Sequence, residues 1–179
     1  MDTPPGKPIT EIKITRSPKR KKTVSARLNN GVLAVCAPSS ISDKELNKIV
    51  TRLTERLLKK NLKRELDRKQ DLKEIAEKLN RAYFGGRLQI TSIEYSTNQN
   101  SRYGCCNLKT GRILISHRLA AMPDWVRDYV IVHELAHLIV PNHSRPFHDL
   151  TDRYRWKERA IGYLMAKGYG EDETDINEL

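Results

Sequence analysis

The sequence contains little cysteine and no long apolar run, and both absences narrow the class of protein. Only three cysteines, Cys36, Cys105 and Cys106, occur among 179 residues. That is too few for the disulfide framework of a small secreted domain. No stretch of about 18 apolar residues is present to span a membrane. The first residues also lack the continuous apolar segment of a secretory signal. These features predict a cytoplasmic protein.

The charge is distributed unevenly along a chain that is otherwise typical of a globular protein, with 38% hydrophobic and 31% charged residues. Residues 1–80 contain 20 Lys or Arg and 10 Asp or Glu, a net charge of +10, whereas residues 81–179 contain 13 and 12, a net charge of +1. A basic half attracts polyanions, so nucleic acid is a candidate partner. The alternative is a solvated, Lys-rich helix face that only keeps the chain in solution.

Residues 1–70 are expected to form a basic region with a small β-sheet and a helix. The segments "ITEIKITR" and "TVSARL" alternate apolar and polar residues, and "NNG" supplies a tight turn before "VLAVCAP". This pattern predicts a small antiparallel sheet. Ser42 and Glu45 have the spacing of a capping box, after which apolar residues recur at helical spacing. A charge-rich helical connector follows, and the domain boundary is placed near residue 70.

Residues 71–179 are expected to form a second domain, which gives the chain an α+β fold. A helix ending at "GG" (85–86) is followed by "RLQITSIEYS" and "SRYGCCNLKTGRILISHRL", which predict a three-stranded sheet. Pro123 and Asp124 suit the first turn of the next helix. That helix is apolar on nearly every side, so it should be buried.

The buried helix carries the motif "HELAH" at residues 133–137. Positions i and i+4 lie on one face of a helix, so His133 and His137 can direct two imidazoles at one metal ion. Glu134 lies beside the first histidine, where its carboxylate can reach a metal-bound water instead of the metal. Ionisable side chains in an apolar helix are costly to bury without a purpose. The motif therefore predicts one catalytic zinc ion per chain, the alternative being histidines merely hydrogen-bonded in a core.

A catalytic zinc ion takes three protein ligands and keeps one open position. Val140 precedes a proline and so should end the helix, and Asn142 accepts a left-handed conformation. The chain can then double back and bring His143 to the site, six residues after His137. Three other side chains are rivals for the third ligand position: His148, Asp149 and Glu158.

Four segments together resemble YgjP-like metallopeptidases, relatives of the SprT-like zincins. They are "RSPKRKKTVSARLNNGVLAVCAPSSIS", "LNRAYFGGRLQI", "YGCCNLKTGRILISHRL" and "DYVIVHELAHLIVPNHSRPF". The resemblance implies a zincin-like α+β core, a zinc-dependent hydrolase and His143 as the third ligand. It also implies a link to proteins bound to DNA, on which SprT-like relatives act. This chain has "YGCC" where the family has Trp-Gly-Ser-Cys, has His148 where the family has a tryptophan, and has a more charged link between sheet and catalytic part.

The predicted function is hydrolysis of peptide bonds in a protein or peptide substrate, with Glu134 accepting a proton from the zinc-bound water. Four side chains are candidates to stabilise the oxyanion: Tyr103, His148, Tyr154 and Arg155. Two other functions stay open at this point. One is a nucleic-acid-binding protein with a structural or degenerate zinc site, and the other is a zinc hydrolase of non-peptide bonds.

Overall fold

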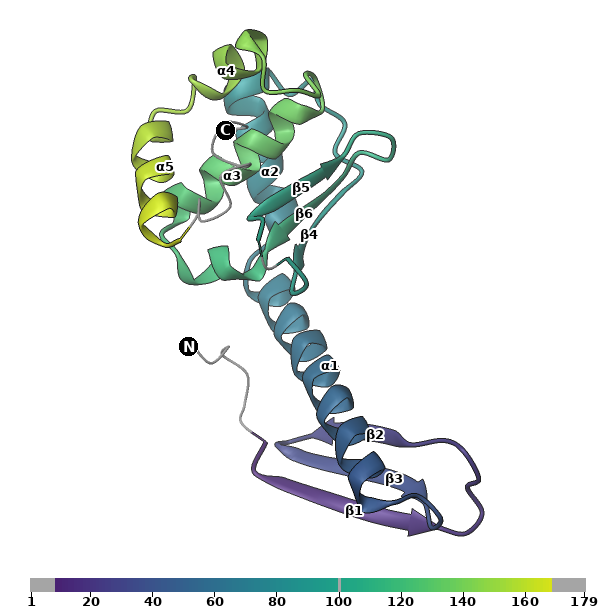
Figure 1. Ribbon diagram of the computed structural model, residues 1–179. Coiled ribbons are helices and arrows are strands. Elements are labelled where there is room, and N and C mark those ends of the chain that lie inside the picture. The colour runs from purple at the N-terminus through teal and green to yellow at the C-terminus, as the bar shows by residue number, and fades with distance from the viewer. Residues whose placement is uncertain (1–8, 100, 169–179) are drawn as a thin grey trace. The chain divides into compact units, whose positions relative to one another are not determined.

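The computed structural model describes residues 9–99 and 101–168. The chain divides into Met1–Glu65, here called unit 1, and Leu66–Leu179, here called unit 2. The division falls within one helix, α1 (Asp43–Lys69), and the boundary near residue 70 stays a prediction. The described residues form two three-stranded sheets and five α-helices, which confirms the α+β fold class (Figure 1).

Unit 1 begins with three strands, β1 (Glu11–Ser17), β2 (Ser25–Asn29) and β3 (Val32–Pro38), in the order β1-β3-β2. The hairpin of β2 and β3 is antiparallel, as expected, and its turn places Asn30 and Gly31 at φ values of 49° and 83°.

The expectation of a wholly antiparallel sheet in unit 1 is wrong, because β1 pairs with β3 in parallel. The physical reason lies in the order of the strands. The most apolar strand, β3, takes the central position, where Leu33, Val35 and Ala37 are no more than 1% exposed. The connecting segment 18–24 is long enough for β1 and β2 to lie on opposite sides of β3.

Helix α1 covers one face of this sheet through its first four turns (Figure 1). The Ser42 hydroxyl accepts a hydrogen bond from the Glu45 amide at 3.3 Å, as the capping pattern predicts. Leu46 and Val50 are buried with Leu33 and Val35 in the core of unit 1. Burial of this apolar stripe, more than helix propensity, holds the helix on the sheet.

Unit 2 contains the second sheet and the remaining helices. Its elements after α1 are α2 (Leu72–Phe84), β4 (Ser92–Ser96), β5 (Gly104–Asn107), β6 (Arg112–Ser116), a 3-10 helix η1 (His117–Ala121), α3 (Asp124–His137), α4 (Arg145–Thr151) and α5 (Lys157–Ala166). Gly85, at φ 66°, ends α2 in the left-handed conformation. None of these elements, nor any other described helix, is long and apolar enough to cross a membrane.

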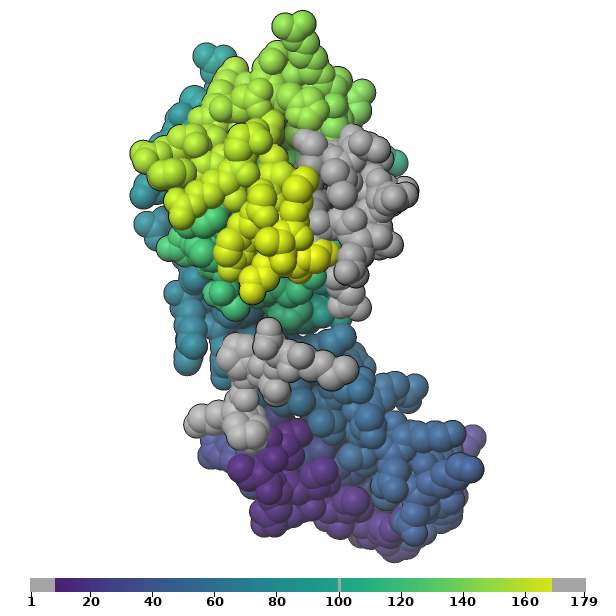
Figure 2. All heavy atoms as spheres, turned by 60° about the vertical axis from the view of Figure 1, so that its left-hand side comes forward, coloured from purple at the N-terminus to yellow at the C-terminus, as the bar shows by residue number. Residues whose placement is uncertain are grey.

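The sheet of unit 2 has the order β4-β6-β5, with β4 parallel and β5 antiparallel to β6. Three strands form as expected, although the first is shorter than "RLQITSIEYS" because only Ser92–Ser96 finds a partner in β6. Helix α3 is buried over ten of its fourteen residues, as predicted. Helices α4 and α5, in yellow-green and yellow, lie at the surface of this unit (Figure 2).

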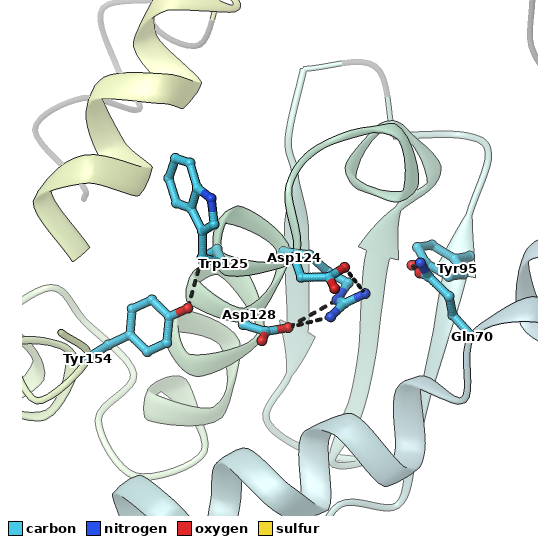
Figure 3. Close-up of polar contacts among 7 residues, drawn as sticks. Gln70, Tyr95, Asp124, Trp125, Asp128 and Tyr154 are labelled. Carbon is cyan, nitrogen blue, oxygen red and sulfur yellow. Dashed lines mark hydrogen bonds and ion pairs between the residues drawn. The ribbon is translucent and has the colours of Figure 1, made fainter. Parts of the chain in front are cut away.

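The first two turns of α3 are anchored by polar contacts (Figure 3). Arg127 is only 6% exposed and forms ion pairs with Asp124 at 2.9 Å and Asp128 at 2.7 Å. The Tyr154 hydroxyl donates to the Trp125 carbonyl at 2.9 Å. The two ion pairs lie within α3 and satisfy the buried guanidinium, whereas the bond from Tyr154 ties the start of α3 to the segment before α5.

Candidate metal centre

His133 and His137 lie one turn apart on α3, and their imidazoles point to the same side. Their Nε2 atoms are 3.2 Å apart. His133 is 7% exposed and lies among apolar residues that bury the helix on its other sides. The helix ends at His137, where Leu138 begins the turn that leads out of it.

The chain then turns back toward these two histidines. The Val140 amide still donates to the Ala136 carbonyl at 2.9 Å, and Pro141 follows outside the helix. His143 comes to lie with its Nε2 atom 3.1 Å from that of His133. The ligand atoms of His133, His137 and His143 all lie within 4.8 Å of one another. Within the described residues, the rivals His148, Asp149 and Glu158 do not belong to this group.

The three nitrogens fit one small metal ion. Two zinc–nitrogen bonds of ~2.0–2.1 Å at a tetrahedral angle place their nitrogens roughly 3.3–3.4 Å apart, close to the 3.1 and 3.2 Å found here. Burial lowers the pKa of His133 well below its ordinary value, and the neighbouring His137 and His143 lower it further. Burial also lowers the pKa of His137. The lowered pKa values favour the neutral form of the His133 and His137 imidazoles, which is the form that binds metals.

Backbone and aromatic contacts hold these rings in place. The Nδ1 atom of His137 lies 3.2 Å from the Val140 carbonyl, so that its Nε2 atom is left free to face the cluster. The ring of Phe147 is fully buried, with its centroid 4.8, 4.6 and 4.6 Å from those of His133, His137 and His143. Sequence reasoning assigned Phe147 no role. The available signal was the position of Phe147 four residues after His143, in "NHSRPF".

Glu134 lies on the wall of the same site, against strand β5. Its side chain is buried, and a Cβ atom added to Gly104 would lie 2.7 Å from its Cδ and 2.8 Å from its Cγ. The carboxylate thus occupies the space that a side chain at position 104 would need. Burial raises the pKa of Glu134 to about 8, an effect that the charge of Arg102 opposes. Sequence reasoning did not identify this role of Gly104.

Gly104→Ala is expected to destabilise the protein by about 1–3 kcal/mol, because the new methyl group overlaps the Glu134 side chain. Removing that side chain should relieve the overlap, so Gly104→Ala should cost less than about 1 kcal/mol when introduced into Glu134→Ala. Urea unfolding of the four proteins measures both values. Gly162→Ala on α5 is the matched control, since a Cβ there meets nothing within 4 Å. Equal costs in both backgrounds would show that the carboxylate does not fill this space.

A cavity of about 220 Å³ opens beside the histidines and Glu134. Its other lining residues come mainly from the β5 segment and α3: Arg102, Tyr103, Gly104, Cys105, Cys106, Leu108, Tyr129, Val130, Pro141 and Leu164. Of the four oxyanion candidates, only Tyr103 is among them. Tyr154 instead donates to a backbone carbonyl, and Arg155 stacks on Trp156 at 4.4 Å.

The two cysteines on β5 border the cavity from different faces of the strand, with Cys105 exposed and Cys106 half-buried. Burial raises the pKa of the Cys106 thiol to about 12, and Glu134 adds to the effect. Metal binding and nucleophilic attack both need a thiolate. The raised pKa favours the neutral thiol form of Cys106 at pH 7.

The part of the chain that contains this site is similar to a known protein family. Residues 88–160 match the family described as YgjP-like, metallopeptidase domain, which confirms the resemblance inferred from the sequence. No curated protein is a significant match. Among solved structures, the metallopeptidase zymogen abylysin of Pyrococcus abyssi is 20% identical, with a TM-score of 0.47 and coverage of 53% of this chain and 92% of that chain. Residues 88–160 are thus similar to a metallopeptidase domain, a class of protein that uses a metal cofactor.

Proposed function

We propose that this protein is a zinc-dependent peptidase in which His133, His137 and His143 hold one zinc ion and Glu134 is the general base. The observation that carries the proposal is the convergence of three imidazoles beside a buried carboxylate, at the edge of a cavity. A structural zinc site has no use for that carboxylate, because all of its positions are filled by ligands.

The chemistry divides between the ion and the protein. A bound zinc ion supplies Lewis-acid chemistry, acidifying water and polarising a carbonyl oxygen. Glu134 takes a proton from the attacking water and returns it to the leaving amine. A carboxyl group whose pKa lies near neutrality suits both halves of this transfer. Gly104 leaves the space that the Glu134 side chain occupies, since a residue larger than glycine at this position of β5 would overlap the carboxylate.

The position of β5 favours a peptide as substrate over a non-peptide compound. This strand lies at the edge of the sheet, and Gly104, Cys105 and Cys106 border the cavity. The backbone of an edge strand can pair with an extended peptide and so align it along the site. A small non-peptide substrate would make no use of such an edge.

Purified protein is expected to contain one zinc ion per chain and to cleave a flexible, unfolded protein such as reduced, alkylated casein. Removing the metal with a chelator should abolish cleavage, and adding zinc should restore it. Metal content is measured by elemental analysis and cleavage by gel electrophoresis. Stoichiometric zinc without cleavage of unfolded or DNA-bound protein would favour a structural site, and hydrolysis of esters but not peptides would favour a non-peptide hydrolase.

A further inference from the structure

Five cations share the outward side of α1 within unit 1. They are Lys44, Lys48, Arg52, Arg56 and Lys59, and together they are called the basic face. Their spacings of three and four residues bring them to one side of the helix. All five are exposed.

The core of unit 1 fixes the direction in which the basic face points. Leu46 and Val50 lie on the opposite side of α1 and are buried against the sheet. The cations therefore project away from the sheet and into solvent. In Figure 2 the atoms of α1, in blue, form much of the visible surface of this unit.

The charge of the basic face is not balanced within the protein. Helix α1 contains ten Lys or Arg and five Asp or Glu, and only Glu45 and Glu55 fall on the same side as the basic face. Among the described residues, none of the five cations forms an ion pair. Exposed cations without partners keep their full attraction for an external polyanion.

The lack of aromatic residues in unit 1 favours double-stranded over single-stranded nucleic acid as the ligand. Residues 1–82 contain no Phe, Tyr, Trp or His. Proteins that bind single strands stack the bases on aromatic rings, and unit 1 has no aromatic side chain for such stacking. Along the ~22 Å that the basic face spans, at ~1.5 Å per residue, a duplex presents roughly 13 negative charges.

We propose that the basic face binds the phosphate backbone of double-stranded nucleic acid without reading its sequence. Lysine and arginine on the outside of a helix serve here as phosphate contacts, and unit 1 contains no aromatic side chain that could stack on bases. This binding does not depend on the proposed peptidase chemistry, because none of the five cations is near the zinc ligands in sequence or lines the cavity.

Fluorescence anisotropy with a labelled 24-bp DNA duplex of arbitrary sequence tests the proposal on the full-length protein. The affinity of the parent should fall by roughly 10²-fold between 50 and 200 mM salt, as expected for four or five phosphate contacts. Changing Lys48, Arg52, Arg56 and Lys59 to Gln should make the slope of log affinity against log salt shallower by about 3–4. Glutamine has a helix propensity close to that of Lys and Arg, so the melting temperature should change little.

A matched variant controls for net charge. It changes four exposed cations of unit 2, Lys73, Lys78, Arg87 and Lys109, to Gln. This variant and Glu134→Gln should bind the duplex like the parent. The proposal is overturned if the parent does not bind duplex at 50 mM salt, if the control loses as much affinity as the basic-face variant, or if the corresponding single strand binds more tightly. Binding to phosphatidylserine vesicles without binding to duplex would assign the face to a membrane surface and equally overturn it.

Discussion

Glu134→Gln is expected to slow peptide hydrolysis by ~10²–10⁴-fold, the usual contribution of general acid–base catalysis. Glutamine has nearly the same size and still fits the space beside Gly104, but it cannot accept a proton from water. Glu134 is not a member of the histidine cluster, so zinc content and melting temperature should stay close to those of the parent. The measurements are the initial rate on an unfolded protein substrate, elemental analysis and thermal unfolding.

Glu158→Gln is the matched control for this change. Glu158 is an exposed glutamate on α5 and was a rival for the third ligand position. Its replacement should leave rate, zinc content and stability unchanged. The general-base assignment fails if Glu134→Gln hydrolyses the substrate as fast as the parent. Loss of zinc in Glu134→Gln would instead mean that the carboxylate is itself a ligand.

His143→Ala is expected to lose zinc and, with it, hydrolysis. Loss of a partner that merely orients a ligand typically costs about 10–100-fold in metal affinity, and removing the ligand itself should cost more. The Nε2 atom of His143 lies 3.1 Å from that of His133, and among the described residues the group has no fourth member. Competition with a chromogenic chelator gives the zinc affinity, and elemental analysis gives the content after dialysis.

His148→Ala provides the comparison, since His148 lies only five residues further along the chain and belongs to α4. It should retain one zinc ion per chain and the zinc affinity of the parent. Should His143→Ala keep its zinc while His148→Ala releases it, the third ligand is His148 and the cluster described here is not the one that binds. Because both changes remove one imidazole, a general effect of losing a histidine cannot produce a difference between them.

The parts of this protein that the sequence determined by itself are those governed by residues close together in the chain. The spacing of His133 and His137 places two imidazoles on one side of a helix in any fold, because an α-helix repeats every ~3.6 residues. The tight turn at Asn30 and Gly31 and the end of α2 at Gly85 follow from local backbone preferences in the same way. The apolar character of "DYVIV" likewise required the helix to be buried, whatever its neighbours were.

Contacts between distant segments were decided only by the tertiary structure. A turn at Pro141 allowed His143 to return to the helix, but the sequence alone left His148, Asp149 and Glu158 as rivals. The structure brings His143 and not these to the other histidines, with Phe147 packed against all three rings.

The parallel pairing of β1 with β3 and the contact of Gly104 with Glu134 lay beyond local patterns altogether. Alternation of apolar and polar residues shows which face of a strand is buried, but it carries no information about the direction of the neighbouring strand. A glycine in a strand likewise shows that something approaches closely, without identifying the side chain. Both depend on which elements pack together, and that is determined by burial of the whole core and not by any single segment.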